Sequence, residues 1–514
     1  MPASMYLVNP ASDFVTYFSA EVLAGSGLPG AILGDLPTTT LAALAPPDFD
    51  ITICDEHIAP VDYDHPADWI GVTGKVNQRQ RMTAIADEFR RRGKRVVMGG
   101  PYASLSPEAL RPHCDVLVRG EVEEMSAELF GDLRAGTPRE EYLGGRPDLA
   151  HSPVPRWDLY ANERALHGAV QTSRGCPFEC EFCDVIQYVG RKQRHKPVDL
   201  VLAELDALYA HSYPAIFLAD DNFTVYRRRA KELLEGIARW RRDHRVNFIT
   251  QVSIDAARDE ELLHMCVDAG LTEVFIGIET PNEESLREAK KRQNLQGNLA
   301  DQVRKFVEHG LAVMGGMVVG FDSDGPDIFE RQYEFAMSIP VPIFSIGALV
   351  APEATPLYDR IARVGRLVRG GSETQAVPWR SNIQPLNMSP DEMRIGMQRL
   401  CNALYAPAAF GERMLRFIEC FGRASRNGLP PAVDPATMRP VDVQAIQLGL
   451  GVRRMGPEEG RMFHRVWAAA SRRPVTVPFV SRMLFTYAQI RHMFEQGGFW
   501  NPRLADSPSA SSPA

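Results

Sequence analysis

Three cysteines lie close together in the chain, and their spacing is typical of a metal centre. Cys176, Cys180 and Cys183 form the pattern C-x3-C-x2-C. Thiolates are the preferred ligands of zinc and of iron–sulfur clusters. A structural zinc site takes four protein ligands, and no fourth cysteine follows at a fixed spacing. The triplet therefore favours a 4Fe-4S cluster held by three cysteines, with one iron open to a further ligand.

A zinc knuckle with His195 as the fourth ligand is the alternative for this segment. His195 belongs to the basic run Gly190–Lys196, which we expect to be a solvated face of the protein. A basic rim beside the cysteines would also suit a carboxylate, a phosphate or an acidic electron donor. The remaining cysteines are isolated, and we expect them in the core: Cys54, Cys114, Cys266, Cys401 and Cys420.

An aromatic residue, Phe182, directly precedes the last cysteine, and with it the triplet resembles the signature of the radical S-adenosylmethionine superfamily. The resemblance implies that Cys176, Cys180 and Cys183 hold a 4Fe-4S cluster. It also implies that the amine and carboxylate of S-adenosylmethionine chelate the open iron. In such enzymes an electron from the cluster produces an adenosyl radical, which removes hydrogen from an unactivated carbon. An electron donor such as flavodoxin or ferredoxin is then expected.

Further residues match the family pattern at the ends of later predicted strands. Asp220 and Asp221 end the second strand, where related proteins place polar groups near the methionyl amine. Glu279 ends the fourth strand, where it would hydrogen-bond S-adenosylmethionine. Gly316 and Gly320 belong to a fifth strand that resembles the family's stretch beside adenine, since glycine lets a backbone approach a ligand closely. Ordinary turn chemistry at strand ends is the alternative for these positions, because the family's glycine-glycine-glutamate motif is not present in its usual form.

The elements that position these residues form a series of alternating strands and helices. Strands are predicted near residues 169–173, 215–219, 247–253, 273–279, 313–319 and 343–350. This α/β pattern predicts a central partial (β/α)6 barrel over residues 151–365. Residues 366–504 are expected to form a helical C-terminal region. The small, polar residues 505–514 are expected to be a disordered tail.

The first part of the chain predicts a second α/β unit, a doubly wound parallel sheet over residues 1–150. Short apolar runs at 6–8, 51–54, 69–72, 95–98 and 115–118 alternate with amphipathic stretches. A Gly- and Pro-rich stretch over 135–160 is expected to be the linker to the barrel. In open α/β sheets ligands bind at the carboxyl ends of the strands, and here Thr73, Gly99 and Gly100 lie at such ends.

A doubly wound domain before this barrel resembles the cobalamin-binding subclass of the superfamily. The resemblance implies that Thr73, Gly99 and Gly100 line the corrin ring. The barrel and the helical region, especially 183–192, resemble the branch that contains the bacterial hopanoid methylases. The implied function is methylation, through cobalamin, of an unactivated carbon of a hydrophobic small molecule or lipid. A cobalamin-linked cyclase or oxidoreductase is an alternative, and a non-catalytic iron–sulfur and cobalamin sensor is another.

An axial histidine for cobalt is not expected from the one candidate segment. Asp55, Glu56 and His57 come within one residue of the motif D-x-H-x-x-G by which other cobalamin proteins supply that ligand. The segment lacks the glycine, and Pro60 and Pro66 prevent a long helix from starting directly after it. We therefore expect His57 not to bind cobalt.

The helical region contains two further patterns. Ser389 and Glu392 have the spacing of a capping box, which predicts a helix start. Six apolar residues recur at helical spacing near the end of the chain: Phe479, Met483, Leu484, Tyr487, Ile490 and Phe494. This stripe predicts a helix packed on the barrel, with a lid over an apolar substrate or a membrane contact as the alternative.

Composition and charge narrow the function classes. The 514 residues hold 57 Lys and Arg against 65 Asp and Glu, a net charge of −8 that does not suit a nucleic-acid binder. The longest apolar stretch, 311–321, is shorter than the roughly 20 residues of a bilayer span. Eight cysteines are too few for a disulfide scaffold of this length. We expect a cytoplasmic protein without a signal peptide or transmembrane segment.

Overall fold

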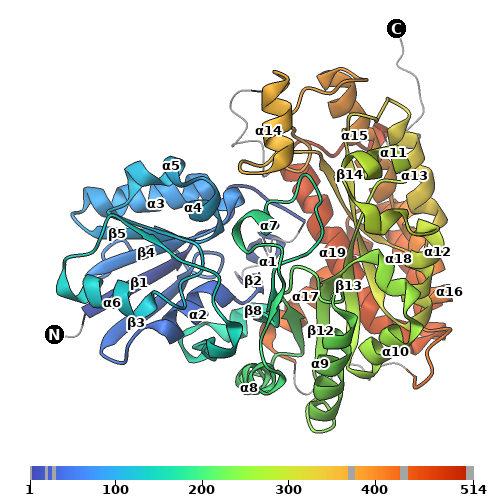
Figure 1. The fold of residues 1–514 in the computed structure, drawn as a ribbon. Helices are drawn as coiled ribbons and strands as arrows, with labels where there is room; N and C mark the ends of the chain where they lie inside the picture. Colours follow the sequence, from blue (N-terminus) through green and yellow to red (C-terminus); the bar gives the residue numbers. More distant parts are fainter. Residues whose placement is uncertain (1–2, 18–20, 26–29, 369–376, 429–437, 505–514) are drawn as a thin grey trace.

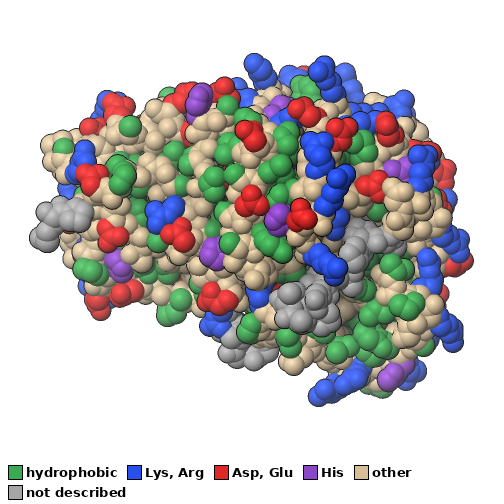
Figure 2. Space-filling view, turned by 90° about the horizontal axis from the view of Figure 1, so that it is seen from below, with side chains coloured by type: hydrophobic (Ala, Val, Ile, Leu, Met, Phe, Trp, Pro, Cys, Tyr) green, Lys and Arg blue, Asp and Glu red, His purple; other side chains and the backbone are tan. Residues whose placement is uncertain are grey.

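A computed structural model describes residues 3–17, 21–25, 30–368, 377–428 and 438–504 (Figure 1). The predicted tail 505–514 lies outside these residues. Two parallel sheets organise the chain, one in the first part and one in the middle. Charges of both signs are interspersed over the face shown in Figure 2, as the nearly balanced composition predicts.

The first sheet has six strands in the order β3-β1-β4-β5-β6-β7. Its strands are β1 (Ala3–Asn9), β3 (Phe49–Asp55), β4 (Trp69–Thr73), β5 (Arg95–Gly99), β6 (Val116–Arg119) and β7 (Glu141–Leu143). Its helices are α2 (Leu36–Leu44), α3 (Arg79–Arg91), α4 (Pro101–Leu105), α5 (Pro107–Leu110) and α6 (Ser126–Ala135). α3, α4 and α5 cover one face and α2 and α6 the other, so the doubly wound prediction is confirmed (Figure 1).

The stretch that we predicted as a linker contributes a strand to this sheet. β7 pairs with β6 in parallel, with Tyr142 opposite Val118. Its three residues are too few to show the alternation by which a strand is recognised in a sequence. Tyr142 is buried, and its hydroxyl donates to Asp132 of α6 at 2.6 Å. Packing against α6 therefore stabilises β7, a strand that the local sequence does not predict.

The second sheet has seven parallel strands in the order β15-β14-β13-β12-β11-β8-β2. They are β2 (Ala31–Leu33), β8 (Ala165–Val170), β11 (Ala215–Leu218), β12 (Asn247–Val252), β13 (Leu271–Glu279), β14 (Ala312–Val319) and β15 (Ile343–Ala348). Its outer helices are α8 (Val198–Tyr209), α9 (Arg227–Trp240), α10 (Glu260–Asp268), α11 (Glu283–Glu288), α12 (Leu299–His309) and α13 (Ile328–Ser338). The six predicted units of a partial barrel are present.

Two features of this sheet differ from the prediction. The first strand of the series runs over 165–170 instead of 169–173. The amides of Thr172 and Ser173 donate to the carboxylate of Asp220, at 2.6 and 3.0 Å, and so leave the strand ladder. An added edge strand, β2, comes from the first 150 residues and pairs with β8, with Leu33 opposite His167. The domain boundary near residue 150 stays a prediction, but the first 150 residues contribute to both sheets.

The C-terminal region is helical in its described residues. Its helices are α14 (Pro356–Arg363), α15 (Pro390–Tyr405), α16 (Pro407–Cys420), α17 (Pro440–Gly451), α18 (Pro457–Arg472) and α19 (Val477–Gln496). The capping box is confirmed: the Glu392 amide donates to Ser389 Oγ, and the Ser389 amide donates to the Glu392 carboxylate. The predicted apolar stripe on α19 is buried, so this helix is a packed one. No helix among the described residues is both long and apolar enough to cross a membrane.

Helices α17 and α19 pack along the open side of the curled sheet together with the start of the chain. Gln489 of α19 accepts from the Val22 amide at 3.3 Å, and Gln444 of α17 donates to the Leu23 carbonyl at 3.0 Å. The Tyr17 hydroxyl donates to the Ile346 carbonyl of β15. α17 was not predicted, because glycines interrupt its pattern. Gly449 is required there: a Cβ at that position would lie 2.8 Å from the Ser481 carbonyl of α19.

Candidate cofactor site

The three cysteines lie on the loop between β8 and α7 (Val185–Tyr188), at the carboxyl end of the sheet. The loop turns at Gly175, whose φ of +101° lies in the region that favours glycine. A Cβ there would stand 2.6 Å from the Lys192 carbonyl. The Gly175 amide donates to Asp221 Oδ2 at 2.7 Å, which fixes the residue directly before Cys176.

Asp220 holds the start of the same loop. Besides the two amides described above, it accepts the hydroxyls of Thr172 and Ser173 at 2.5 and 2.9 Å. Burial raises the pKa of Asp220 and raises that of Asp221 to about 6. The structure therefore brings both predicted aspartates to the cysteine loop, where they position backbone. Direct contact with S-adenosylmethionine stays a prediction for them.

The cysteines fit a cluster by their donor set. All three thiols are free and partly exposed, on one loop. Burial raises the pKa of the Cys176 thiol and raises that of Cys183 to about 12, so bound iron would have to stabilise the thiolates. Gln293 Nε2 lies 3.7 Å from Cys180 Sγ as a weak donor. Among the described residues no group of three His, Cys, Asp or Glu side chains is arranged to hold a single metal ion.

His195 lies beside the start of this loop. It pairs with Ser173 in the short ladder of β9 (Ser173–Arg174) and β10 (Arg194–His195). Its ring stands edge-on to Tyr226, and it lines a small cavity with Asp220 and Arg229 in which no cysteine takes part. This placement does not support the zinc knuckle.

Glu279 ends β13 beside the cysteines and is paired with a lysine that the sequence did not single out. Lys291 forms a buried ion pair with Glu279, and its ammonium lies 5.9 Å from the centre of the Phe182 ring. Burial opposes the charge of Lys291, but Glu279 and Cys180 outweigh it and raise the pKa. Glu279 has a φ of +66°, an unusual value for a residue with a side chain. Backbone strain of this kind is common at functional positions, and a contact of Glu279 with S-adenosylmethionine stays a prediction.

The two glycines of β14 and its following turn have packing reasons for their size. A Cβ at Gly316 would lie 2.8 Å from the ring of Phe275. Gly320 has a φ of +102°, and its amide donates to Asp324 at 2.9 Å. A Cβ there would meet Met393 of α15 at 2.5 Å. A contact with adenine stays a prediction for both glycines.

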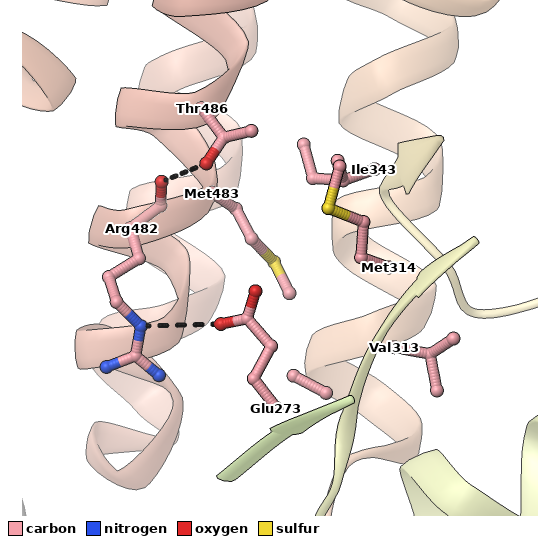
Figure 3. A pocket seen from close by; sticks show the side chains of 8 residues that line it. Glu273, Val313, Met314, Ile343, Arg482, Met483 and Thr486 are labelled. Carbon is pink, nitrogen blue, oxygen red and sulfur yellow. Dashed lines mark hydrogen bonds and ion pairs between the residues drawn. The ribbon is translucent and has the colours of Figure 1, made fainter. Parts of the chain in front are cut away.

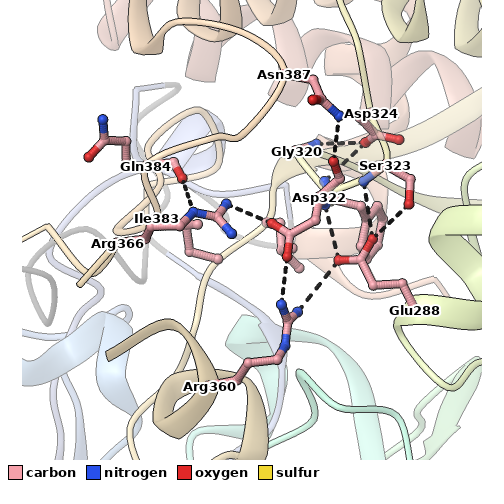
Figure 4. A network of polar contacts seen from close by, with 12 residues as sticks. Glu288, Gly320, Asp322, Ser323, Asp324, Arg360, Arg366, Ile383, Gln384 and Asn387 are labelled. Atoms are coloured by element: carbon pink, nitrogen blue, oxygen red, sulfur yellow. Dashed lines mark hydrogen bonds and ion pairs between the residues drawn. The ribbon is translucent and has the colours of Figure 1, made fainter. Parts of the chain in front are cut away.

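The cysteine loop is also anchored by Arg360 of α14, which belongs to the polar network in Figure 4. Glu181, between the second and third cysteines, accepts a bidentate pair from Arg360 of α14 at 2.8 and 3.0 Å. Arg360 also contacts Asp322 at 2.5 Å and Glu288 at 3.5 Å. The Glu181 amide donates to the Ala289 carbonyl. α14 and the loop after β14 thus fix the segment that separates Cys180 from Cys183.

The predicted corrin-lining residues meet at the carboxyl edge of the first sheet. Thr73 of β4 is in register with Gly99 of β5. Gly100 has a φ of +93°, and a Cβ there would lie 2.6 Å from Thr73 Oγ1. Gly100 begins α4, which packs against α7 directly after the cysteines. The carboxyl edge of the first sheet therefore meets the barrel where α4 contacts α7, directly after the cysteine loop (Figure 1).

A buried charge cluster joins the two sheets at this junction. Arg174 of the loop contacts Glu121 and Glu123, which follow β6, each at 2.6 Å. Arg194 contacts Glu121 at 2.5 Å. Our expectation of a solvated basic face is therefore wrong for Arg194, and also for Lys196, which forms a buried pair with Glu204. It holds for Arg191 and Lys192, which are exposed.

The isolated cysteines differ in how deeply the structure buries them. Cys54, Cys266 and Cys401 are buried, whereas Cys114 and Cys420 are partly exposed.

His57 follows β3, and its Nδ1 lies 2.9 Å from Asp55 Oδ1. Asp55 also accepts the Tyr160 hydroxyl at 2.7 Å. His57 therefore already has a protein partner on that ring nitrogen.

Comparisons with known proteins agree with this arrangement. Residues 170–333 match the model of the radical SAM superfamily, and residues 355–496 match a domain of unknown function (DUF4070). An uncharacterized methyltransferase of Synechocystis sp. is 35% identical over 346 residues, which are 66% of this chain and 64% of that protein. The hopanoid C-2 methylase of Rhodopseudomonas palustris is 30% identical over 386 residues, or 73% of this chain and 71% of the methylase.

The fold also has a solved counterpart. The cobalamin-dependent S-adenosylmethionine radical enzyme OxsB, solved with aqua-cobalamin and S-adenosylmethionine bound, superposes with a TM-score of 0.60 at 14% identity. The match covers 96% of this chain and 80% of OxsB, so both sheets and the helical region share that architecture. The family model, the cysteine loop and the methylase relative show that the chain belongs to the radical S-adenosylmethionine superfamily, in the branch that contains hopanoid methylases, and its fold is that of the cobalamin-dependent enzyme OxsB.

Proposed function

We propose that this protein is a cobalamin-dependent radical S-adenosylmethionine methyltransferase that methylates an unactivated carbon of a hydrophobic lipid of the hopanoid class. The observation that supports the reaction best is the junction of the two strand edges. The cysteine loop and the edge formed by Thr73 and Gly100 lie on opposite sides of one contact, between α7 and α4. Two cofactors bound at these edges would share one reaction space.

Different residues of the chain would hold the cluster and S-adenosylmethionine. Cys176, Cys180 and Cys183 would hold the 4Fe-4S cluster. When bound, the cluster supplies the electron that cleaves S-adenosylmethionine, and cobalamin supplies the methyl group. Glu279 and Lys291 present a carboxylate and an ammonium beside the cluster loop, where they would orient the charged methionyl end of S-adenosylmethionine.

The first sheet would hold the corrin ring by backbone rather than by a histidine. Thr73, Gly99 and Gly100 form a small-residue edge on which a flat ring can lie closely. The pairing of His57 with Asp55 gives that imidazole a structural partner. A carboxylate on one ring nitrogen does not exclude the other as a metal ligand, so our expectation that His57 does not bind cobalt rests on the incomplete motif, which lacks the glycine.

The lipid substrate is proposed from the relatives. The name of the Rhodopseudomonas palustris relative states that it methylates a hopanoid. We place the reaction in the cytoplasm, with a flavodoxin or ferredoxin as electron donor, because the exposed Arg191 and Lys192 beside the cysteine loop suit an acidic partner.

The test is anaerobic reconstitution of the full chain with iron, sulfide and hydroxocobalamin. We expect about four irons per chain with the spectrum of a 4Fe-4S cluster, and cobalamin retained through gel filtration. With dithionite, S-adenosylmethionine and a hopanoid, both 5′-deoxyadenosine and S-adenosylhomocysteine should form. Cys180→Ala should abolish cleavage of S-adenosylmethionine, and Cys266→Ala, a change at a buried cysteine of α10, should not.

Each other outcome would refute a separate part of the proposal. Release of 5′-deoxyadenosine without S-adenosylhomocysteine would replace methyl transfer by a cyclase or oxidoreductase reaction. Loss of cobalamin on gel filtration, with the cluster intact, would remove the cobalamin mechanism. Full cleavage activity of Cys180→Ala would overturn the cluster assignment.

A further inference from the structure

The segment that follows α11 lies against the cysteine loop. The Glu181 amide of that loop donates to the Ala289 carbonyl at 3.0 Å. Lys291, two residues further along, lies 5.9 Å from the centre of the Phe182 ring. The short helix η7 (Arg292–Leu295) begins directly after it. This helix therefore starts beside the residues that separate the second and third cysteines.

One side chain of η7 fixes the helix to the end of β13. Asn294 Nδ2 donates to the carbonyls of Gly277 and Ile278, at 3.0 and 2.9 Å, and Asn294 is buried. The Asn294 amide donates to the Lys291 carbonyl at 3.1 Å, which closes the turn. Because both ends of this turn are bonded to their surroundings, the residue before Asn294 has a fixed position relative to the sheet.

That preceding residue, Gln293, directs its amide group at a cluster ligand. Its Nε2 lies 3.7 Å from Cys180 Sγ. Gln293 is 4% exposed, and its Oε1 has no hydrogen-bond partner among the residues that the structure describes. A sulfur that binds iron is a thiolate, which accepts hydrogen bonds and donates none. With a cluster bound, the amide of Gln293 must therefore present its nitrogen, and not its oxygen, to Cys180.

A hydrogen bond to a cluster ligand stabilises the reduced state more than the oxidised state. Reduction adds one electron, and hydrogen bonds to the sulfurs are among the factors that set the potential of such clusters. Gln293 donates from a buried position, where the low effective dielectric constant strengthens a hydrogen bond to a charged group. The amide carries no net charge, so it acts mainly on the sulfur that it contacts. Loss of this donor should therefore lower the reduction potential.

We propose that Gln293 raises the reduction potential of the 4Fe-4S cluster through Cys180, and so favours the electron transfer that starts the reaction. The proposal rests on the function proposed above and concerns the same site. The step is the transfer of one electron to the cluster from a reduced flavodoxin or ferredoxin, with no bond formed or broken in the protein. Because it acts through a ligand, Gln293 is a positioning residue and not a catalytic one.

The test is a redox titration of the reconstituted full-length protein, followed by the EPR signal of the reduced cluster without S-adenosylmethionine. Gln293→Met removes the donor and keeps a side chain of similar length. At a fixed potential, the ratio of reduced to oxidised cluster should fall about tenfold, which corresponds to a midpoint potential about 59 mV lower. Gln293→Asn keeps the amide but is one methylene shorter, so it should lower the potential as well.

Two controls remove a neutral hydrogen-bonding side chain elsewhere. Gln398→Met, the same change on α15, gives up a bond to the Phe499 carbonyl at 3.1 Å. Thr486→Val, on α19, gives up a bond to the Arg482 carbonyl at 3.1 Å, beside a small cavity at the amino end of β13 (Figure 3). The cysteines lie at the carboxyl end of the sheet. Both controls should therefore keep the midpoint potential of the parent protein.

The outcomes separate failure of this proposal from failure of the proposed function. Parent-like potentials in Gln293→Met and Gln293→Asn would overturn the role of Gln293 and leave the cluster assignment intact. A parent protein without a 4Fe-4S spectrum would refute the proposed function, and this proposal with it. If Gln293→Met alone binds no cluster, Gln293→Asn decides the question. If neither variant binds a cluster while both controls do, Gln293 only holds the loop, and the proposal is wrong.

Discussion

At the scale of single residues, Lys291 provides a positive charge beside the cysteines. It is buried and paired with Glu279, whose backbone is in an unfavourable conformation. Replacing Lys291 by Met would leave a buried carboxylate without its partner, at a cost of about 3–5 kcal/mol in the free energy of unfolding. Urea unfolding of the metal-free protein measures this loss.

A double variant makes that prediction specific. Adding Glu279→Gln to Lys291→Met removes the isolated charge, so most of the lost stability should return. Glu283→Ala, which breaks an exposed pair with Arg287 on α11, serves as the control and should change stability by less than about 1 kcal/mol. A Lys291→Met protein as stable as the parent would contradict the structural role of the pair.

The residues of the site differ in how far the sequence reveals them. Cys176 and its two partners are found because their spacing is local, and Asp220 because it directly follows a strand. Lys291 lies in a basic stretch that looks like a solvated face, and only the fold brings it to Glu279. Arg174 likewise meets Glu121 across 53 residues of sequence. Pairs of this kind depend on tertiary packing and leave no local pattern.

At the scale of elements, Asp35 connects the pH dependence of stability with the start of α2. Its carboxylate accepts from the Thr38 amide at 3.0 Å as the helix N-cap. Burial, together with Asp55, raises the pKa of Asp35 from 3.8 to about 6. A raised pKa in the folded state means that ionisation destabilises the fold, so stability should fall as pH rises from about 4 to 6.

The variant Asp35→Asn tests this sign, because asparagine is an equally good N-cap without a charge. It should match the parent near pH 4 and exceed it by about 3 kcal/mol above pH 6, as a shift of about two pKa units requires. Stability is measured by urea unfolding at each pH. A variant that is less stable than the parent at pH 7 would show that the charge of Asp35 contributes favourably.

The close packing of α17 on α19 requires a glycine at position 449. Gly449→Ala would gain about 1 kcal/mol of helix propensity, but its Cβ would press on the α19 backbone, at a cost of about 1–3 kcal/mol. We expect a lower melting temperature. Gly131→Ala in α6, where a Cβ has open space, is the matched control and should raise it. A stabilised Gly449→Ala protein would contradict the close contact of the two helices.

At the scale of the whole molecule, Glu121 neutralises two arginines at the junction of the sheets. Glu121→Ala would leave Arg194 without its acidic partner and Arg174 with only Glu123. We expect faster amide hydrogen exchange in the cysteine loop and in the turn after β6, and weaker retention of cobalamin. Glu128→Ala removes an exposed pair with Arg139 and should change neither. Unchanged exchange in Glu121→Ala would show that apolar contacts alone hold the sheets together.

The positions of the strands could be predicted from the sequence more completely than the pairing of the short edge strands. Alternating apolar runs locate most strands of both sheets, because buried parallel strands have a strong local signal. The exceptions are β2 and β7, with three residues each, whose pairing is decided by neighbours far away in the sequence. β7 joins the first sheet and β2 joins the second, so our prediction of a single sheet from the first 150 residues missed the pairing of β2 with β8.

The crossing of β2 into the second sheet has a consequence for synthesis on the ribosome. Leu33 emerges long before its partner His167, and at about 5–20 residues per second the delay is roughly 7–27 s. During that interval the first sheet can assemble around a strand that has nothing to pair with. The nascent chain must keep β2 accessible until β8 has been synthesised. Slower or interrupted translation would prolong the time in which a strand of another chain can pair with β2 in place of β8.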